Sequence, residues 1–192
     1  MPAPQPLLFI VHPGSACGSA DMNLGRDAAG FLRAQMQLLI ESWEGGVVVI
    51  DGEISDELTE GYGRSSWREL GVAIEEALAR AAQSNQLSVR IRGDDSEEFD
   101  QDDAARKVVA EHGLAPASVD ITLTGAWVED DGSGCVNSVR AVLAGLGFTP
   151  DVSDAMDLDY NNGEEDEEEM EDEAPALVAP STASKPRAPG RK

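Results

Sequence analysis

The sequence predicts a doubly wound α/β fold, in which a mostly parallel β-sheet is covered by helices on both faces. Two short runs, residues 7–11 and 47–50, contain only apolar side chains, as in strands that are buried on both faces. Strand-like and helix-like patterns alternate four times along the chain, with short loops between them. Because this alternation is typical of βαβ units, which join parallel strands, we expect a Rossmann-like arrangement.

The first half of the chain supplies two strands and two helices. The first apolar run is followed by a loop from His12 to Asp21, and then by apolar residues at helical spacing from about 31 to 43. Two glycines end this helix, and the second apolar run follows them directly. A second helix is expected over about residues 67–82, because its large apolar side chains fall on one face.

The second half repeats the same order. Residues 87–92 alternate apolar and polar side chains, as expected of a strand, and residues 100–112 have the pattern of a helix. A fourth strand is expected at 119–126 and a fourth helix at about 135–146. Val152 marks a short fifth strand. These elements make residues 1–160 one α/β domain.

The segment beyond the domain has a different composition. Residues 161–192 contain nine acidic residues in one block, then a Pro/Ala/Ser-rich stretch that ends with four basic residues. Such a segment cannot bury a core, so we expect it to be disordered. Its charge suggests a role in solubility, or in binding a basic protein partner.

Charge and cysteine content restrict the function classes. The net charge is −23, of which the tail accounts for −5, so the domain itself is strongly acidic. Direct binding to nucleic acid phosphates and to acidic membrane surfaces is therefore not expected. The two cysteines do not make a disulfide framework, and the N-terminus has neither a basic region nor an apolar run long enough for a signal or membrane span. We expect a cytoplasmic protein with free thiols.

Candidate functional residues follow the strands, because open parallel sheets bind ligands outside the carboxyl ends of their strands. The polar and thiol side chains at these four places are His12, Ser15 and Cys17; Asp51, Glu53 and Asp56; Arg92, Asp94 and Asp95; and Trp127, Asp130, Asp131, Cys135 and Asn137. Among the acids, Asp51, Glu53 and Asp56 could bind Mg²⁺ through water, but solvated loop acids are the more ordinary interpretation. We expect neither a metal nor a cofactor.

Cys135 has the clearest chemical rationale of these residues. It lies where a loop enters a helix, and free backbone N–H groups and the helix dipole at such a place favour the thiolate. A pairing of Cys135 with Cys17 would be conceivable if the first and fourth strands were neighbours. Trp127 could stack on a substrate or pack at the rim, and Ser15 and Asn137 are the other candidate substrate-binding residues.

A set of short motifs surrounds Cys135. They are Leu123-Thr-Gly125 at the strand end, Cys135-Val136 at the helix start, Gly147-Phe148 after the helix, and Ser153-Asp154-Ala155 after the short fifth strand. Their order and spacing resemble the isochorismatase-like cysteine hydrolases over residues 119–156, and more loosely over 87–118. The resemblance implies a doubly wound fold, a nucleophilic cysteine, hydrolysis of amide-like C–N bonds in a small-molecule substrate, and a homo-oligomer.

The residues that would assist the cysteine in catalysis differ from the family pattern. That family has an aspartate at the end of the first strand and a lysine after the third, and this chain has His12 and Arg92 in those neighbourhoods. One interpretation makes Cys135 the nucleophile, His12 its general base and Arg92 an anchor for an anionic substrate. The other interpretation retains the scaffold without catalysis, with Cys135 as a packed small residue, and assigns function to the acidic surface as an interaction protein.

Overall fold

The computed structural model describes residues 3–17, 26–51, 64–92, 99–126, 128 and 132–153. Within these residues the elements in chain order are β1 (Gln5–Val11), the 3₁₀ turn η1 (Pro13–Ala16), α2 (Arg26–Ser42), β2 (Gly46–Asp51), α4 (Arg64–Gln83), β3 (Ser88–Arg92), α5 (Gln101–Glu111), β4 (Val119–Gly125), α6 (Cys135–Gly145) and β5 (Asp151–Val152). The alternation of strands and helices predicted from the sequence is confirmed.

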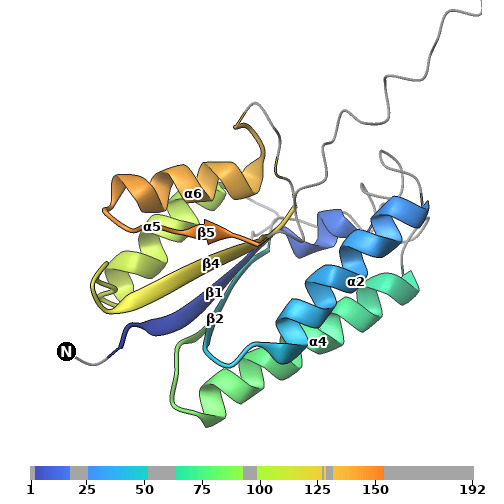
Figure 1. Cartoon of the computed structure of the whole chain (residues 1–192), viewed down its shortest axis with the longest axis horizontal. Helices are drawn as coiled ribbons and strands as arrows, with labels where there is room; N and C mark the ends of the chain where they lie inside the picture. Colours follow the sequence, from blue (N-terminus) through green and yellow to red (C-terminus); the bar gives the residue numbers. More distant parts are fainter. Residues whose placement is uncertain are drawn as a thin grey trace, which may run out of the picture.

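All strand pairs in the described part are parallel, and the strands form one sheet in the order β3-β2-β1-β4-β5. Figure 1 labels β2, β1, β4 and β5 in this order. The chain proceeds from the central strand β1 outward through β2 to β3, then crosses to β4 on the other side of β1. This order reverses between β1 and β4, where Val11 pairs with Gly125. In doubly wound folds, ligands bind at the carboxyl edge of the sheet at such a reversal point.

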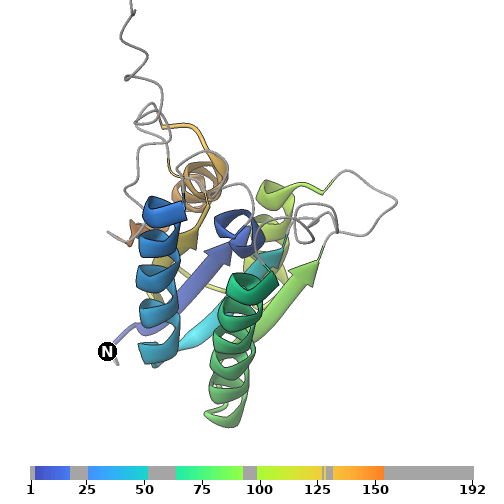
Figure 2. The ribbon, with the colours of Figure 1, turned by 90° about the vertical axis from the view of Figure 1, so that its right-hand side faces the viewer.

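Two helical layers cover the sheet. Helices α2 and α4 lie side by side on one face, and α5 and α6 lie on the other (Figures 1 and 2). Because side chains alternate along a strand, β1 contributes Leu8 and Ile10 to the core under α2 and α4, and Leu7, Phe9 and Val11 to the core under α5 and α6. Strands β1 and β2 consist mainly of apolar residues because helices cover both faces of the sheet at these strands.

The structure changes some predicted boundaries. Helices α2 and α4 begin earlier than expected, at Arg26 and Arg64. Strand β2 is one residue longer than the apolar run predicts, because it includes Asp51. The loop after β1 contains the turn η1, which Pro13 starts. The short fifth strand is confirmed at Asp151–Val152, where it pairs with β4. The tail, residues 161–192, and Asp56 lie outside the described residues.

No helix within the described residues is long and apolar enough to cross a membrane.

Candidate site at the carboxyl edge of the sheet

The carboxyl ends of four adjacent strands bring polar residues to one edge of the sheet. His12 follows β1, Asp51 is the last residue of β2, and Arg92 is the last residue of β3. β4 ends at Gly125 on the other side of β1. The helix that follows β4 begins at Cys135.

His12 is held in an unusual backbone conformation. Its φ of 45° and ψ of 52° are in the left-handed region, which few non-glycine residues adopt. Its backbone N–H donates to the carbonyl of Ile50 (2.8 Å), and its carbonyl accepts from the N–H of Ser15 (3.0 Å). These two bonds attach the residue to β2 on one side and to η1 on the other. The strain at His12 is therefore offset by the pairing of the strand ends and by the turn.

The imidazole of His12 is largely enclosed. Its ring lies against the ring of Phe99, with the centroids 5.7 Å apart. Its Nε2 atom is buried and has no hydrogen-bond partner among the described residues. Burial lowers the pKa of His12 below its usual 6.5, and the negative charge of Asp51 opposes this shift in part. The side chain is therefore neutral at pH 7 and able to accept a proton.

Cys135 is the first residue of α6. The helix is preceded by Gly134 at φ 90°, a residue without a side chain that could cap the first turn. The thiol is half-buried and packs against the core formed with α5 and α6. One turn further along, the Ser138 hydroxyl donates to the Asp102 carboxylate (2.7 Å), which joins the first turns of α6 and α5.

His12 and Cys135 are linked through the core under α5 and α6. Phe99, which contacts the His12 ring, directly precedes the N-cap residue of α5, Asp100, and packs against the core under α5 and α6. The Ser138–Asp102 hydrogen bond joins the starts of the two helices, so the entry to α6 lies beside the segment that contacts His12. The sequence indicated both residues but gave no basis for this link through Phe99.

The environment of Asp51 differs from the sequence-based interpretation. The sequence indicates a solvated loop acid, but the Asp51 side chain is only 7% exposed. Its Oδ2 atom accepts a hydrogen bond from Nε of Arg90 (2.5 Å) and forms an ion pair with Nη2 (2.5 Å), and the third guanidinium nitrogen of Arg90 pairs with Glu75 of α4. The Oδ1 atom of Asp51 is buried and has no hydrogen-bond partner among the described residues. Asp51 is buried because Arg90 of β3 covers its carboxylate and is itself held by Glu75 of α4.

The remaining predicted residues are placed as follows. The Arg92 side chain is 68% exposed, and its Nε lies 3.9 Å from Asp51 Oδ2, so the guanidinium is accessible to an anion at this edge. The Asn137 side chain donates to the carbonyl of Ser133 (2.7 Å), and Ser15 is half-buried in η1. Trp127 lies outside the described residues.

The two cysteines belong to different layers. Although β1 and β4 are neighbours, Cys17 is buried in the core under α2 and α4, while Cys135 packs against the core on the opposite face. The sheet therefore separates them, and the structure gives no support to a redox pair. In the described part of the chain, no three His, Cys, Asp or Glu side chains gather as a metal site would require.

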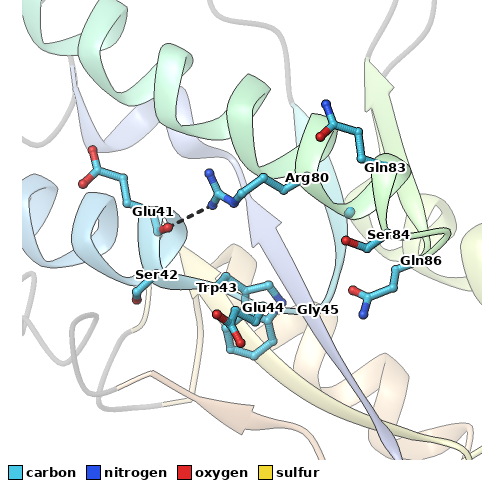
Figure 3. Close-up of a pocket in the computed structure, with 10 residues that line it drawn as sticks. Glu41, Ser42, Trp43, Glu44, Gly45, Arg80, Gln83, Ser84 and Gln86 are labelled. Carbon is cyan, nitrogen blue, oxygen red and sulfur yellow. Dashed lines mark hydrogen bonds between the residues drawn. The ribbon is translucent and has the colours of Figure 1, made fainter.

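A hollow of about 550 Å³ lies at the opposite edge of the sheet, where α2 and α4 end (Figure 3). Arg80 donates there to the carbonyls of Ile40 (2.9 Å) and Glu41 (3.0 Å), and the Trp43 indole donates to the carbonyl of Gly46 (3.0 Å). These contacts satisfy the carbonyls at the end of a helix, which is a structural role. The candidate functional site lies at the carboxyl edge of the sheet, away from this hollow.

Comparison with known proteins adds no further assignment. No protein-family model, no curated protein and no solved structure matches the chain. The functional assignment therefore depends on the site itself.

Proposed function

We propose that this protein is a thiol-dependent hydrolase of amide-like C–N bonds, with Cys135 as nucleophile and His12 as general base. One observation carries the proposal: the buried Nε2 of His12 has no hydrogen-bond partner among the described residues, and its ring contacts Phe99, which packs against the same core as Cys135. Leaving a buried polar atom unpaired costs about 1–3 kcal/mol. A role in a reaction accounts for this cost at His12.

The chemistry expected at this edge follows from the protonation states. A neutral His12 accepts the proton of the thiol as the sulfur attacks a carbonyl carbon, and then delivers it to the leaving nitrogen. The positive end of the α6 dipole, where Gly134 precedes the helix, can stabilise the oxyanion that forms. Arg92, which is exposed, would attract a substrate that carries a negative charge.

Alkylation kinetics test this assignment. In a Cys17→Ser background, iodoacetamide should label Cys135 at pH 7 at least about tenfold faster than it labels the same protein with His12→Gln, because the base is lost. Labelling should also slow as the pH falls through the lowered pKa of His12, since the protonated ring cannot accept a proton. Rates are followed by mass spectrometry of the Cys135 peptide.

His112→Gln is the matched control, because this other histidine is the C-cap residue of α5 and lies away from the site. It should leave the labelling rate unchanged. Equal rates in the parent and in His12→Gln, or a Cys135 that never reacts in the folded protein, would contradict the proposal.

The acidic composition supports a second candidate, an interaction protein that retains the scaffold without catalysis. The net charge of −23 and the acidic block at 164–173 would bind a basic partner electrostatically. Deleting residues 161–192 should then weaken binding to a poly-lysine surface by about fivefold at 0.15 M salt, with little binding to either form at 0.5 M. Deletion of only residues 185–192, which removes the basic end, is the control and should not weaken binding. Equal binding by all three forms would rule out the tail as the binding segment.

A further inference from the structure

The carboxyl ends of β2 and β3 carry a second group of polar side chains, on the face of the sheet under α4. Because side chains alternate along a strand, Asp51 lies on the same face as Val49 and opposite to Ile50. Arg92 is the register partner of Asp51 on β3, and its Nε lies 3.9 Å from Asp51 Oδ2. Cys135 packs against the core on the opposite face, so this group is separate from the thiol.

One oxygen of the Asp51 carboxylate is satisfied, and the other is not. Oδ2 accepts a hydrogen bond from Arg90 Nε (2.5 Å), and Glu75 of α4 pairs with the same guanidinium. Oδ1 is buried and has no hydrogen-bond partner among the described residues. Since the Asp51 side chain is more than nine-tenths buried, the missing hydrogen bond has a substantial free-energy cost. Oδ1 is thus a charged acceptor that a donor on a ligand would satisfy.

The charges around Oδ1 select the kind of donor. In the described part of this group, Arg90 and Arg92 balance Asp51 and Glu75, so a cation would gain little by binding here. A neutral hydroxyl can donate to Oδ1 without adding charge. The Arg92 side chain is 68% exposed, and its guanidinium has the fork geometry that binds a phosphate with two hydrogen bonds. Together, Asp51 and Arg92 suit a ligand with a hydroxyl close to a phosphate.

The sheet topology places these two residues where α/β proteins bind the ribose of a nucleotide. In doubly wound sheets with this strand order, an acid near the carboxyl end of β2 accepts from a ribose hydroxyl, and a nearby arginine can bind a phosphate on the same sugar. The two oxygens of a carboxylate are at most about 2.5 Å apart, so Arg92 Nε lies within about 6.4 Å of Asp51 Oδ1. A ribose phosphate spans such a distance. The exposed Arg92 side chain changes rotamer freely, which lets the sugar reach Oδ1.

We propose that Asp51 and Arg92 bind a ribonucleotide, in which a ribose hydroxyl donates to Asp51 Oδ1 and a phosphate binds Arg92. The inference goes beyond the proposed hydrolase and does not depend on it, because it uses neither His12 nor Cys135. The ligand is a mononucleotide rather than a dinucleotide. The loop after β1 lacks the Gly-x-Gly-x-x-Gly pattern that would bring backbone N–H groups to a pyrophosphate.

Isothermal titration calorimetry of the full chain tests the inference. The probes are the 2′- and 5′-monophosphates of adenosine, guanosine, cytidine and uridine, and at least one should bind saturably with one site per chain. Asp51→Asn should weaken that binding at least about tenfold, because the hydroxyl loses a charged acceptor. Arg92→Gln should weaken it by a similar factor and remove most of its dependence on salt concentration. Arg106→Gln, at an arginine of α5 whose side chain is 52% exposed, is the matched control and should bind like the parent.

The outcomes decide the inference separately from the hydrolase, which the labelling of Cys135 tests. Binding that Arg92→Gln weakens and Arg106→Gln does not supports the inference, and this comparison decides if Asp51→Asn fails to fold. If none of these nucleotides binds the parent at up to about 5 mM, the inference is overturned. Equal binding by the parent and Arg92→Gln also overturns it. So does full binding by a folded Asp51→Asn, because Arg92 would then attract anions without any recognition of the ribose.

Discussion

Replacing Gly125 with alanine should destabilise the domain by about 4 kcal/mol or more, a large part of the total stability of a typical domain. Gly125 ends β4 at φ 139°, a conformation that side chains with a Cβ rarely adopt. A Cβ at this position would overlap the carbonyl oxygen of Val11 and stand 2.7 Å from the Val11 nitrogen. Since these are backbone atoms of the central strand, they cannot move aside without breaking the pairing of β1 and β4.

Urea denaturation followed by circular dichroism measures this effect. Gly71→Ala is the matched control, because Gly71 lies within α4 and an added Cβ would meet no atom within 4 Å. That variant should be about 0.5–1 kcal/mol more stable than the parent, since alanine favours the helix. A Gly125→Ala protein that unfolds at the urea concentration of the parent would show that β4 does not approach β1 as closely as described.

The same close approach also affects the candidate site. The N–H of Ala126 donates to the carbonyl of Val11 (2.9 Å), directly before His12 and directly after Gly125. The glycine thus allows β4 to remain paired with β1 up to the point where the two chains diverge around the site. For this reason we expect any folded fraction of Gly125→Ala to have a disturbed His12 as well as lower stability.

The fold could be predicted from the sequence because it depends on local patterns. The wholly apolar runs of β1 and β2 and the helical spacing in α4 and α6 each follow from a few neighbouring residues. Their alternation is sufficient to predict a parallel sheet with helices on both faces. The boundaries were less accurate where helices begin, as at Arg64, because helix starts are marked only weakly in the sequence.

The candidate site was predicted only in part, because its properties depend on contacts between distant segments. The sequence placed His12 and Cys135 at strand ends, but the burial of His12 depends on Phe99, which is far from it along the chain. The sequence does not distinguish Asp51 from a solvated acid. The distinction requires knowing that β3 is the neighbouring strand, because Arg90 of β3 pairs with the Asp51 carboxylate. An arginine within a strand of alternating pattern was the one available signal, and it is a weak one.

Replacing Arg90 with methionine should destabilise the domain by about 3–5 kcal/mol at pH 7, because it leaves the Asp51 carboxylate buried and without its partner. Methionine has a similar length and no charge, so the loss is mainly electrostatic. The Asp51 side chain is only 7% exposed, so bulk water cannot replace the hydrogen bond and the ion pair that Arg90 supplies. Unfolding in urea at pH 7 gives the free energy for the parent and the variant.

Two further variants separate the buried pair from the exposed one. Glu75→Gln removes the other carboxylate partner of Arg90, which is 62% exposed, and should cost at most about 1 kcal/mol. Combining Arg90→Met with Asp51→Asn should recover part of the lost stability, because the neutral amide no longer needs a counter-ion. If Arg90→Met costs no more than Glu75→Gln, the carboxylate does not depend on Arg90. The orientation of the Asp51 carboxylate would then have another basis than its contacts with Arg90, which is the only described side chain within 3 Å of Oδ2.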